Sequence, residues 1–269
     1  MIHQRARGDL RLSFKRRGAA TVLDGLRQEG ALKARFPRPE RGAWASAVTL
    51  NSSGGVAGGD RLTTTITAGP GTQATVASQA AERFYRALPG TDPARIDTTL
   101  RVAPGAALEW LPQETILFDR ASVQRRLSIH LAPDSWFLCV EHWVFGRTAM
   151  DETVHDARLR DLIQLRRDGR LLLHDAIRLD GPVQAVLNRP AAGAGARAAA
   201  TLIHAAPDAA ARLDALRAAL AGTEAGASAD DGILVARIVA PNGACLRAAI
   251  VAGLQALRAA RPLPRVWLC

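Results

Sequence analysis

The chain has 269 residues, of which 48% are hydrophobic and 4% aromatic, and its formal net charge is +10. A chain of this length buries roughly three quarters of its unfolded surface, so it needs no disulfide framework, and its three cysteines have no short spacing. No stretch approaches the roughly 18 apolar residues of a membrane span. The basic first residues lack the apolar core of a secretory signal, so we expect a cytoplasmic protein.

The positive charge is carried almost entirely by arginine, since only Lys15 and Lys33 are lysines. Nucleic-acid-binding proteins concentrate their basic residues and place aromatic residues among them. Here the arginines are spread along the chain, and the densest cluster is Lys15-Arg16-Arg17. This distribution favours a basic surface that binds protein. A basic nucleic-acid-binding β protein stays open as an alternative.

Short segments with alternating apolar residues, typical of half-buried strands, fill the first half of the chain. They are residues 10–14, 21–23, 32–36, 44–50, 62–68, 75–77, 96–102 and 123–131. Glycine and proline separate several of them, as at Gly69-Pro70-Gly71 and Pro104-Gly105. Many short strands at this spacing predict a mainly β sandwich, barrel or β-helix. No sequence repeat of fixed length supports a regular solenoid.

Four glycines, Gly54, Gly55, Gly58 and Gly59, lie within six residues between two of these strands. A phosphate-binding loop would need Lys-Ser/Thr or a helix after the glycines. The residues that follow Asp60 and Arg61 are instead threonine-rich and β-branched, which predicts a strand. We therefore interpret the glycines as a structural corner, where the chain needs backbone angles that other residues avoid.

The second half begins with residues 136–145, whose uniformly apolar character predicts a strand covered on both faces. Asp168-Gly169 between two apolar segments predicts a two-residue hairpin. Two helices are expected, one after Pro207-Asp208 and one after Asn242, which is a good helix N-cap. Residues 222–232 are small and polar, so we expect a loop there. No linker appears, and we expect a single domain over residues 1–269.

Candidate metal ligands crowd together only at Cys139-Val140-Glu141-His142. Alternate residues of a strand face opposite sides, so His142 would point away from Cys139 and Glu141. The remaining histidines have no partner at a ligand spacing, and a core thiol explains Cys139 best. A catalytic Gly-x-Ser-x-Gly motif is also missing. The sequence thus predicts no tightly bound metal or cofactor and no enzyme.

Several carboxylates lie in or beside apolar strands, which is costly unless they are paired or hydrated. They are Asp60, Glu114, Asp119, Glu141 and Asp175. Each of them taken alone is best explained by an ion pair with one of the many arginines. Together they are also suited to line a wet interior passage for a divalent cation. Both interpretations stay open.

Three segments resemble the UreD family of urease accessory proteins, called UreH in some organisms. They are Gly54-Gly55-Val56-Ala57-Gly58-Gly59-Asp60-Arg61-Leu62, Phe84-Tyr85-Arg86 and Trp110-Leu111-Pro112-Gln113-Glu114-Thr115-Ile116-Leu117-Phe118. The resemblance runs from Asp9 to Trp267. It implies a UreD-like domain of stacked short strands, β-helix-like or sandwich-like, with two α-helices near the C-terminus.

The resemblance also implies a function without catalysis. A UreD-like protein would bind urease apoprotein and the accessory proteins F and G, and would assist nickel delivery to the urease active site. Nickel would be in transit, and Asp60, Glu114, Glu141 and Asp175 would line its passage. The alternatives are an unrecognised hydrolase or transferase, and the nucleic-acid-binding protein named above.

Overall fold

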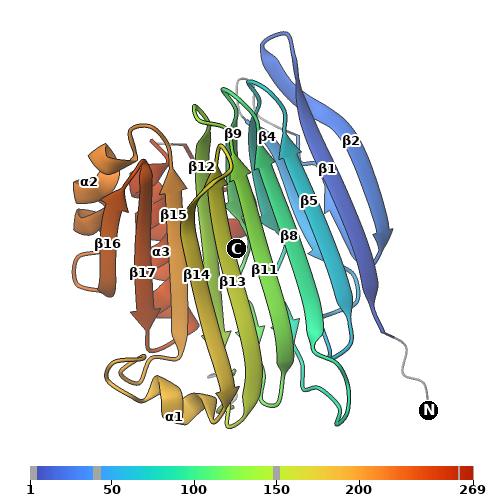
Figure 1. Cartoon of the computed structure of the whole chain (residues 1–269), viewed down its shortest axis with the longest axis vertical. Coiled ribbons are helices and arrows are strands. Elements are labelled where there is room, and N and C mark those ends of the chain that lie inside the picture. The colour runs from blue at the N-terminus through green and yellow to red at the C-terminus, as the bar shows by residue number, and fades with distance from the viewer. Residues whose placement is uncertain (1–4, 39–43, 148–151, 260, 269) are drawn as a thin grey trace.

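The computed structural model describes residues 5–38, 44–147, 152–259 and 261–268. Two β-sheets stacked face to face make up most of it, and helices pack against the outer face of one sheet (Figure 1). The prediction of a mainly β fold is confirmed.

The front sheet in Figure 1, here called sheet A, has seven strands. In spatial order they are β14 (Arg170–Gly181), β13 (Ala157–Arg167), β11 (Ser122–Leu131), β8 (Ala94–Val102), β5 (Arg61–Ala68), β1 (Arg7–Arg17) and β2 (Ala20–Gly30). The central pairs from β1 to β13 are parallel. The predicted hairpin is confirmed, because Asp168 and Gly169 connect β13 to β14 with positive φ angles of 49° and 75°.

The second sheet, sheet B, has ten strands. Eight form a continuous order: β16 (Glu224–Asp230), β17 (Ile233–Ala240), β15 (Ala198–Ala205), β12 (Trp136–Phe145), β9 (Ala107–Leu111), β6 (Gln73–Ser78), β4 (Ala45–Asn51) and β3 (Leu32–Arg35). The two short strands β10 (Thr115–Leu117) and β7 (Glu82–Phe84) extend it beside β12. The expected loop at residues 222–232 is wrong in part, since β16 lies there and pairs with β17.

Between β4 and β13 the chain alternates between the sheets and adds parallel strands to each in turn. This winding is that of a β-helix, while the two layers are those of a sandwich. In sheet B the successive strands begin at residues 45, 73, 107 and 136. These intervals are unequal, which explains why the sequence shows no fixed repeat although the strands wind regularly.

Apolar side chains from both sheets fill the space between them. Ile66, Leu100, Ile129 and Leu165 lie side by side at one level of sheet A, and all four are fully buried. Burial of each such side chain stabilises the fold by roughly 1.5–3 kcal/mol. Strand β12 is buried on both faces, as predicted, because its other face contacts the helices.

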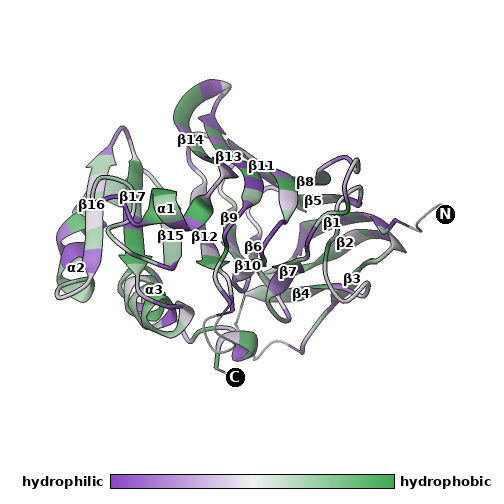
Figure 2. Cartoon of the chain, turned by 90° about the horizontal axis from the view of Figure 1, so that it is seen from below, coloured by the Kyte–Doolittle hydropathy of each residue, from purple (hydrophilic) through white to green (hydrophobic). Residues whose placement is uncertain are grey.

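The longest helix, α3 (Gly243–Leu257), packs on the face of sheet B that points away from sheet A (Figure 2). It begins after Asn242, whose side chain accepts a hydrogen bond from the Cys245 N–H at 2.8 Å. The other predicted helix is α2 (Leu213–Ala219), which follows a 3₁₀ turn at Ala209–Arg212. A third helix, α1 (Val183–Leu187), was not predicted. Among the described residues, none of the helices is both long and apolar enough to cross a membrane.

Candidate functional site

The glycine corner between β4 and β5 needs glycine for steric reasons. Gly55 has φ of 139°, and a Cβ atom there would lie 2.4 Å from the Tyr85 ring and 2.9 Å from the Arg83 carbonyl oxygen. The close approach allows the Val56 N–H to donate to the Arg83 oxygen and the Tyr85 N–H to donate to the Val56 oxygen, both at 2.8 Å. The corner is therefore built to lie against β7.

Strand β7 in turn pairs with β10, so the three segments on which the family resemblance rests meet in space. Together they form part of the wall of an interior cavity of about 270 Å³ between the two sheets. The polar and charged side chains that line it include Asn51, Glu82, Thr115, Arg125 and Glu141. The glycine corner thus shapes a cavity that holds titratable groups.

Asp60 has a structural role at the corner. Its carboxylate accepts hydrogen bonds from the backbone N–H groups of Ala6 and Ala57, each at 2.8 Å. The side chain is buried and lines a separate surface hollow, not the cavity that contains Glu141. Glu114 is also apart, with 36% of its side chain exposed and Arg247 at 3.9 Å. The structure therefore does not bring Asp60 or Glu114 together with the other two candidates.

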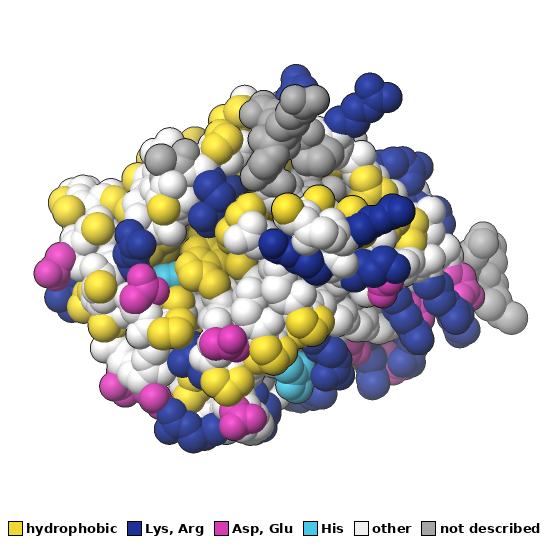
Figure 3. All heavy atoms as spheres, turned by 90° about the horizontal axis from the view of Figure 1, so that it is seen from above, with side chains coloured by type: hydrophobic (Ala, Val, Ile, Leu, Met, Phe, Trp, Pro, Cys, Tyr) yellow, Lys and Arg dark blue, Asp and Glu magenta, His cyan; other side chains and the backbone are white. Residues whose placement is uncertain are grey.

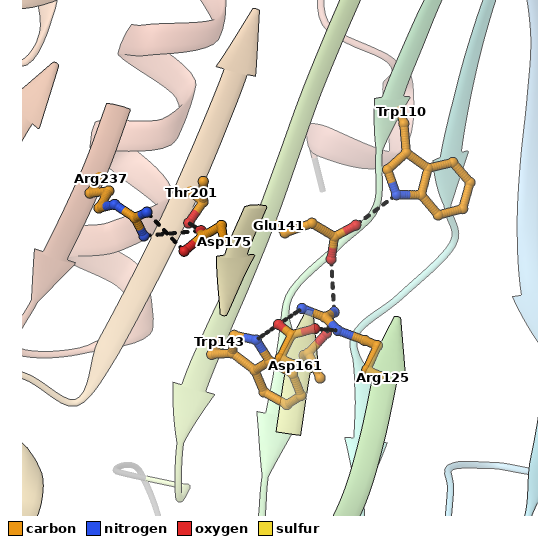
Figure 4. Close-up of polar contacts among 9 residues, drawn as sticks. Trp110, Arg125, Glu141, Trp143, Asp161, Asp175, Thr201 and Arg237 are labelled. Atoms are coloured by element: carbon orange, nitrogen blue, oxygen red, sulfur yellow. Dashed lines mark hydrogen bonds and ion pairs between the residues drawn. The ribbon is translucent and has the colours of Figure 1, made fainter. Parts of the chain in front are cut away.

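Glu141 on β12 belongs to a buried ionic cluster between the sheets (Figure 4). Its carboxylate contacts an Arg125 guanidinium nitrogen at 2.7 Å and accepts a hydrogen bond from the Trp110 indole N–H at 2.7 Å. Arg125 on β11 also binds Asp161 through two hydrogen bonds of 2.8 and 2.5 Å. The Asp161 carboxylate accepts a further bond from the Trp143 indole N–H. One arginine thus holds two carboxylates.

Asp175 on β14 lies near this cluster in a second ion pair (Figure 4). The Arg237 guanidinium donates to both of its oxygens at 3.0 and 2.8 Å, and the Thr201 hydroxyl donates at 3.2 Å. A second cavity, of about 180 Å³, is lined by Glu141, Asp161 and Asp175. Glu141 lines both cavities, so it stands between them.

The cluster has an excess of negative charge, with consequences for its protonation. Burial raises the pKa of Glu141, Arg125 opposes that rise, and the neighbouring Asp161 adds to it. Burial also tends to lower the pKa of Arg125, but Asp161 and Glu141 outweigh it, so the pKa of the guanidinium lies above its ordinary value. Arg125 therefore stays charged, and the Glu141 carboxyl ionises less readily than an exposed glutamate does.

Glu82 is a second titratable carboxyl in the first cavity. Burial raises its pKa from 4.5 to about 7, although hydrogen bonds from the Asn51 amide partly oppose the rise. In the unfolded chain this carboxyl ionises near its ordinary value. Between the two pKa values the unfolded state binds fewer protons than the folded state, so the free energy of unfolding falls as the pH rises through this window.

We expect Glu82→Gln to remove this pH dependence. At pH 4 the variant and the parent chain should be similarly stable, whereas at pH 8 the variant should be more stable by up to about 3 kcal/mol, the energy of a 2.5-unit shift. Urea unfolding at a series of pH values measures the difference. Glu224→Gln on the exposed strand β16 is the matched control. An equal stability difference for Glu82→Gln at both pH values would contradict the prediction.

The structure confirms the prediction that Cys139 and His142 lie on opposite faces of their strand, β12. Cys139 is buried among the apolar side chains between the sheets, and burial raises the pKa of its thiol. His142 points to the other side of β12, where its ring lies 5.6 Å from that of Trp267. Within the described ranges, no three His, Cys, Asp or Glu side chains are grouped so that they could hold a metal ion.

Glu82, Arg125 and Asp161 were not predicted from the sequence as residues of the site. A usable signal was present for the last two, because each is a charged residue on the apolar face of an alternating strand. Arg125 falls between Val123 and Leu127, and Asp161 between Leu159 and Ile163. A charge at a core position indicates either a buried pair or a functional group. Glu82 carried no such signal, since its burial depends on how β7 packs.

Similarity to known proteins identifies the family of this chain. The family model described as UreD urease accessory protein matches residues 6–268. The chain belongs to the UreD family of urease accessory proteins. The urease accessory protein UreD of Methylobacterium sp. (strain 4-46) is 48% identical over 258 residues, which are 93% of this chain and 90% of that protein.

Further relatives give the same result. The UreD protein of Xanthobacter autotrophicus is 46% identical over 99% of this chain and 91% of its own length. That of Azorhizobium caulinodans is 44% identical over 98% of this chain and 97% of its own length. This UreD-family chain accordingly has a role in urease maturation.

Proposed function

We propose that this UreD-family chain is a non-catalytic cytoplasmic scaffold. It binds urease apoprotein and the accessory proteins F and G, and it passes nickel through its interior to urease. The observation that carries the nickel passage is the position of Glu141 between two interior cavities, with Asp161 and Asp175 on the far side.

The chemistry of this cluster supports a passage more than a storage site. A nickel ion in the first cavity meets the Glu141 carboxylate, which is already held by Arg125 and Trp110. The ion must displace the guanidinium to bind, and the guanidinium can displace the ion in turn. Oxygen ligands without a histidine or cysteine cluster bind Ni²⁺ weakly. The guanidinium and the nickel ion can therefore exchange at the Glu141 carboxylate, and this exchange favours release of the nickel ion.

We expect Glu141→Gln to lower the nickel content of urease while the accessory complex still assembles. Glutamine keeps the shape and can still accept the Trp110 hydrogen bond, but it removes the charge that attracts the ion. Loss of one charge in a partly screened site corresponds to a drop of about tenfold in nickel transfer. The measurement is nickel per urease by mass spectrometry after co-expression with the urease and accessory subunits, with complex formation followed by size-exclusion chromatography.

Glu224→Gln serves again as the exposed control and should leave nickel loading unchanged. Asp175→Asn, the second variant, tests the second cavity and should also lower the nickel content of urease. Full nickel loading in both variants with the complex intact would rule out the passage. Active, fully loaded urease in cells that lack this chain would instead rule out the scaffold, so the two failures are distinguishable.

The two alternatives are also testable. Turnover of a nucleotide, ester or amide by the purified chain would favour an enzyme. Salt-sensitive retention of DNA or RNA at physiological ionic strength would favour a nucleic-acid-binding protein.

A further inference from the structure

A row of arginines crosses the outer face of sheet A, the face that points away from sheet B. The register of the strands places one residue from each of six strands side by side: Arg7, Arg61, Arg95, Gln124, Arg160 and Arg178. We call these six residues the arginine row. At the usual spacing between strands, the row is about 24 Å long.

The arginines of the row are exposed and poorly neutralised. Arg61 and Arg178 each have one distant aspartate partner, Asp92 at 3.9 Å and Asp180 at 4.0 Å. Arg7, Arg95 and Arg160 form no ion pair with any residue that the structure describes. Like charges on neighbouring strands destabilise a sheet. The row therefore costs stability, and within the described chain its arginines form ion pairs only with the two distant aspartates, Asp92 and Asp180.

The surface around the row is hollowed. A depression of about 540 Å³ is lined by five arginines and two aspartates: Arg95, Arg125, Arg126, Arg160, Arg178, Asp97 and Asp161. Another of about 380 Å³ lies at the opposite end of the row, where three arginines line it with two carboxylates: Arg7, Arg27, Arg61, Asp9 and Glu29. Lys and Arg side chains also gather at the other end of the molecule, which is seen from above in Figure 3, on the side of β1 and β2. The cationic groups thus line concave surface into which a partner's side chains can reach.

We propose that the arginine row is a docking surface for a partner protein that presents a row of carboxylates. Arginine binds a carboxylate through two parallel hydrogen bonds, which gives both energy and orientation. Such a partner would neutralise the three unpaired arginines and remove the repulsion within the row. The proposal goes beyond the proposed function and does not depend on nickel passage.

The residues around the row favour a protein over a nucleic acid. On the same face, Asp9 and Asp97 lie two positions further along their strands, and Asp180 lies on the other side of the row. These carboxylates would repel the phosphates of a bulky polyanion, whereas a single row of partner carboxylates fits between them. The row and the adjacent level, which includes Leu162 and Ala176, also carry no aromatic side chain on which bases could stack.

The test measures binding of a labelled peptide of about twelve glutamates to the purified chain by fluorescence anisotropy at low and at near-physiological salt. We expect the parent chain to bind at low salt and Arg95→Glu/Arg160→Glu to bind at least about tenfold more weakly, since two attractive contacts become repulsive. The peptide should also raise the Tm of the parent chain and not that of the variant.

Arg17→Glu/Arg189→Glu is the matched control, because it makes the same charge change at exposed residues outside the row. It should bind within about threefold of the parent chain, as only the net charge has changed. Circular dichroism verifies that each variant is folded, and Arg95→Gln/Arg160→Gln provides a milder second variant. Failure of the parent chain to bind the peptide, or an equal loss in the control, would overturn the proposal. Tighter binding of duplex DNA through the same arginines would also overturn it.

Discussion

Replacing Glu109 by alanine is expected to lower the free energy of unfolding by about 3–5 kcal/mol, the usual cost of leaving a buried charge without its partner. Glu109 lies on β9, and its side chain is completely buried. Its carboxylate accepts hydrogen bonds from Arg258 at 2.8 Å, from Arg261 at 2.9 Å and from the Thr75 hydroxyl at 2.6 Å.

The removed carboxylate would leave Arg258, whose side chain is 4% exposed, without a counter-charge. Although burial raises the pKa of Glu109, Arg258 and Arg261 lower it more strongly, so the carboxylate is ionised in the fold. Arg258 follows the last turn of α3, and Arg261 lies over the rings of Trp44 and Trp136 at 4.0 and 5.0 Å. The pair therefore fixes the end of α3 to sheet B.

Urea unfolding of the purified variants measures this effect. Glu224→Ala, which removes an exposed carboxylate, should change the free energy of unfolding by less than about 0.5 kcal/mol. The double variant Glu109→Leu/Arg258→Met should be more stable than the sum of the single changes predicts, because it leaves neither partner stranded. Additive effects in this cycle, or a loss below about 1 kcal/mol for Glu109→Ala, would contradict the assignment.

The second large effect is expected at Arg125, because this guanidinium neutralises Glu141 and Asp161 together. Arg125→Met should cost about 3–5 kcal/mol at pH 8, since two buried carboxylates then repel each other. Arg125 also packs with its guanidinium carbon 4.3 Å from the centre of the Trp143 ring, and methionine retains part of that contact. The loss is therefore mainly electrostatic.

The pH dependence distinguishes charge from packing. Without Arg125, burial raises the pKa of Glu141 further, so between pH 5 and pH 8 the folded variant binds a proton that the unfolded chain does not bind. The variant should thus recover part of its stability at pH 5. Arg101→Met, at an exposed position of sheet A, is the control and should show no such recovery. An equal loss at pH 5 and pH 8 would indicate that only packing matters.

Local features of the fold could be predicted from the sequence because neighbouring residues determine them. Asp168-Gly169 predicts its hairpin since both residues tolerate positive φ. Asn242 predicts the start of α3 since its side chain can cap the first turn. The alternation of residues 62–68 and 123–131 predicts strands with one buried face, which β5 and β11 have. In each case the physical cause lies within a few residues of its effect.

Strand β16 and helix α1 were not predicted from the sequence in this way. The small residues of Glu224–Asp230 have little preference for a strand, and they adopt one because the neighbouring β17 offers a free edge. The β-helix-like winding could not be predicted either, since successive strands of one sheet are separated by unequal numbers of residues and leave no repeat in the sequence.

For the candidate site, the sequence was enough to recognise Glu141 and Asp175 as carboxylates in apolar strands and to show that arginines are abundant enough to pair with them. Which arginine pairs with which carboxylate follows from the three-dimensional fold. Arg125 meets Asp161 across neighbouring strands of sheet A and Glu141 across the space between the sheets. Such contacts join residues far apart in the chain, and they depend on the register and stacking of whole strands, to which every buried side chain contributes.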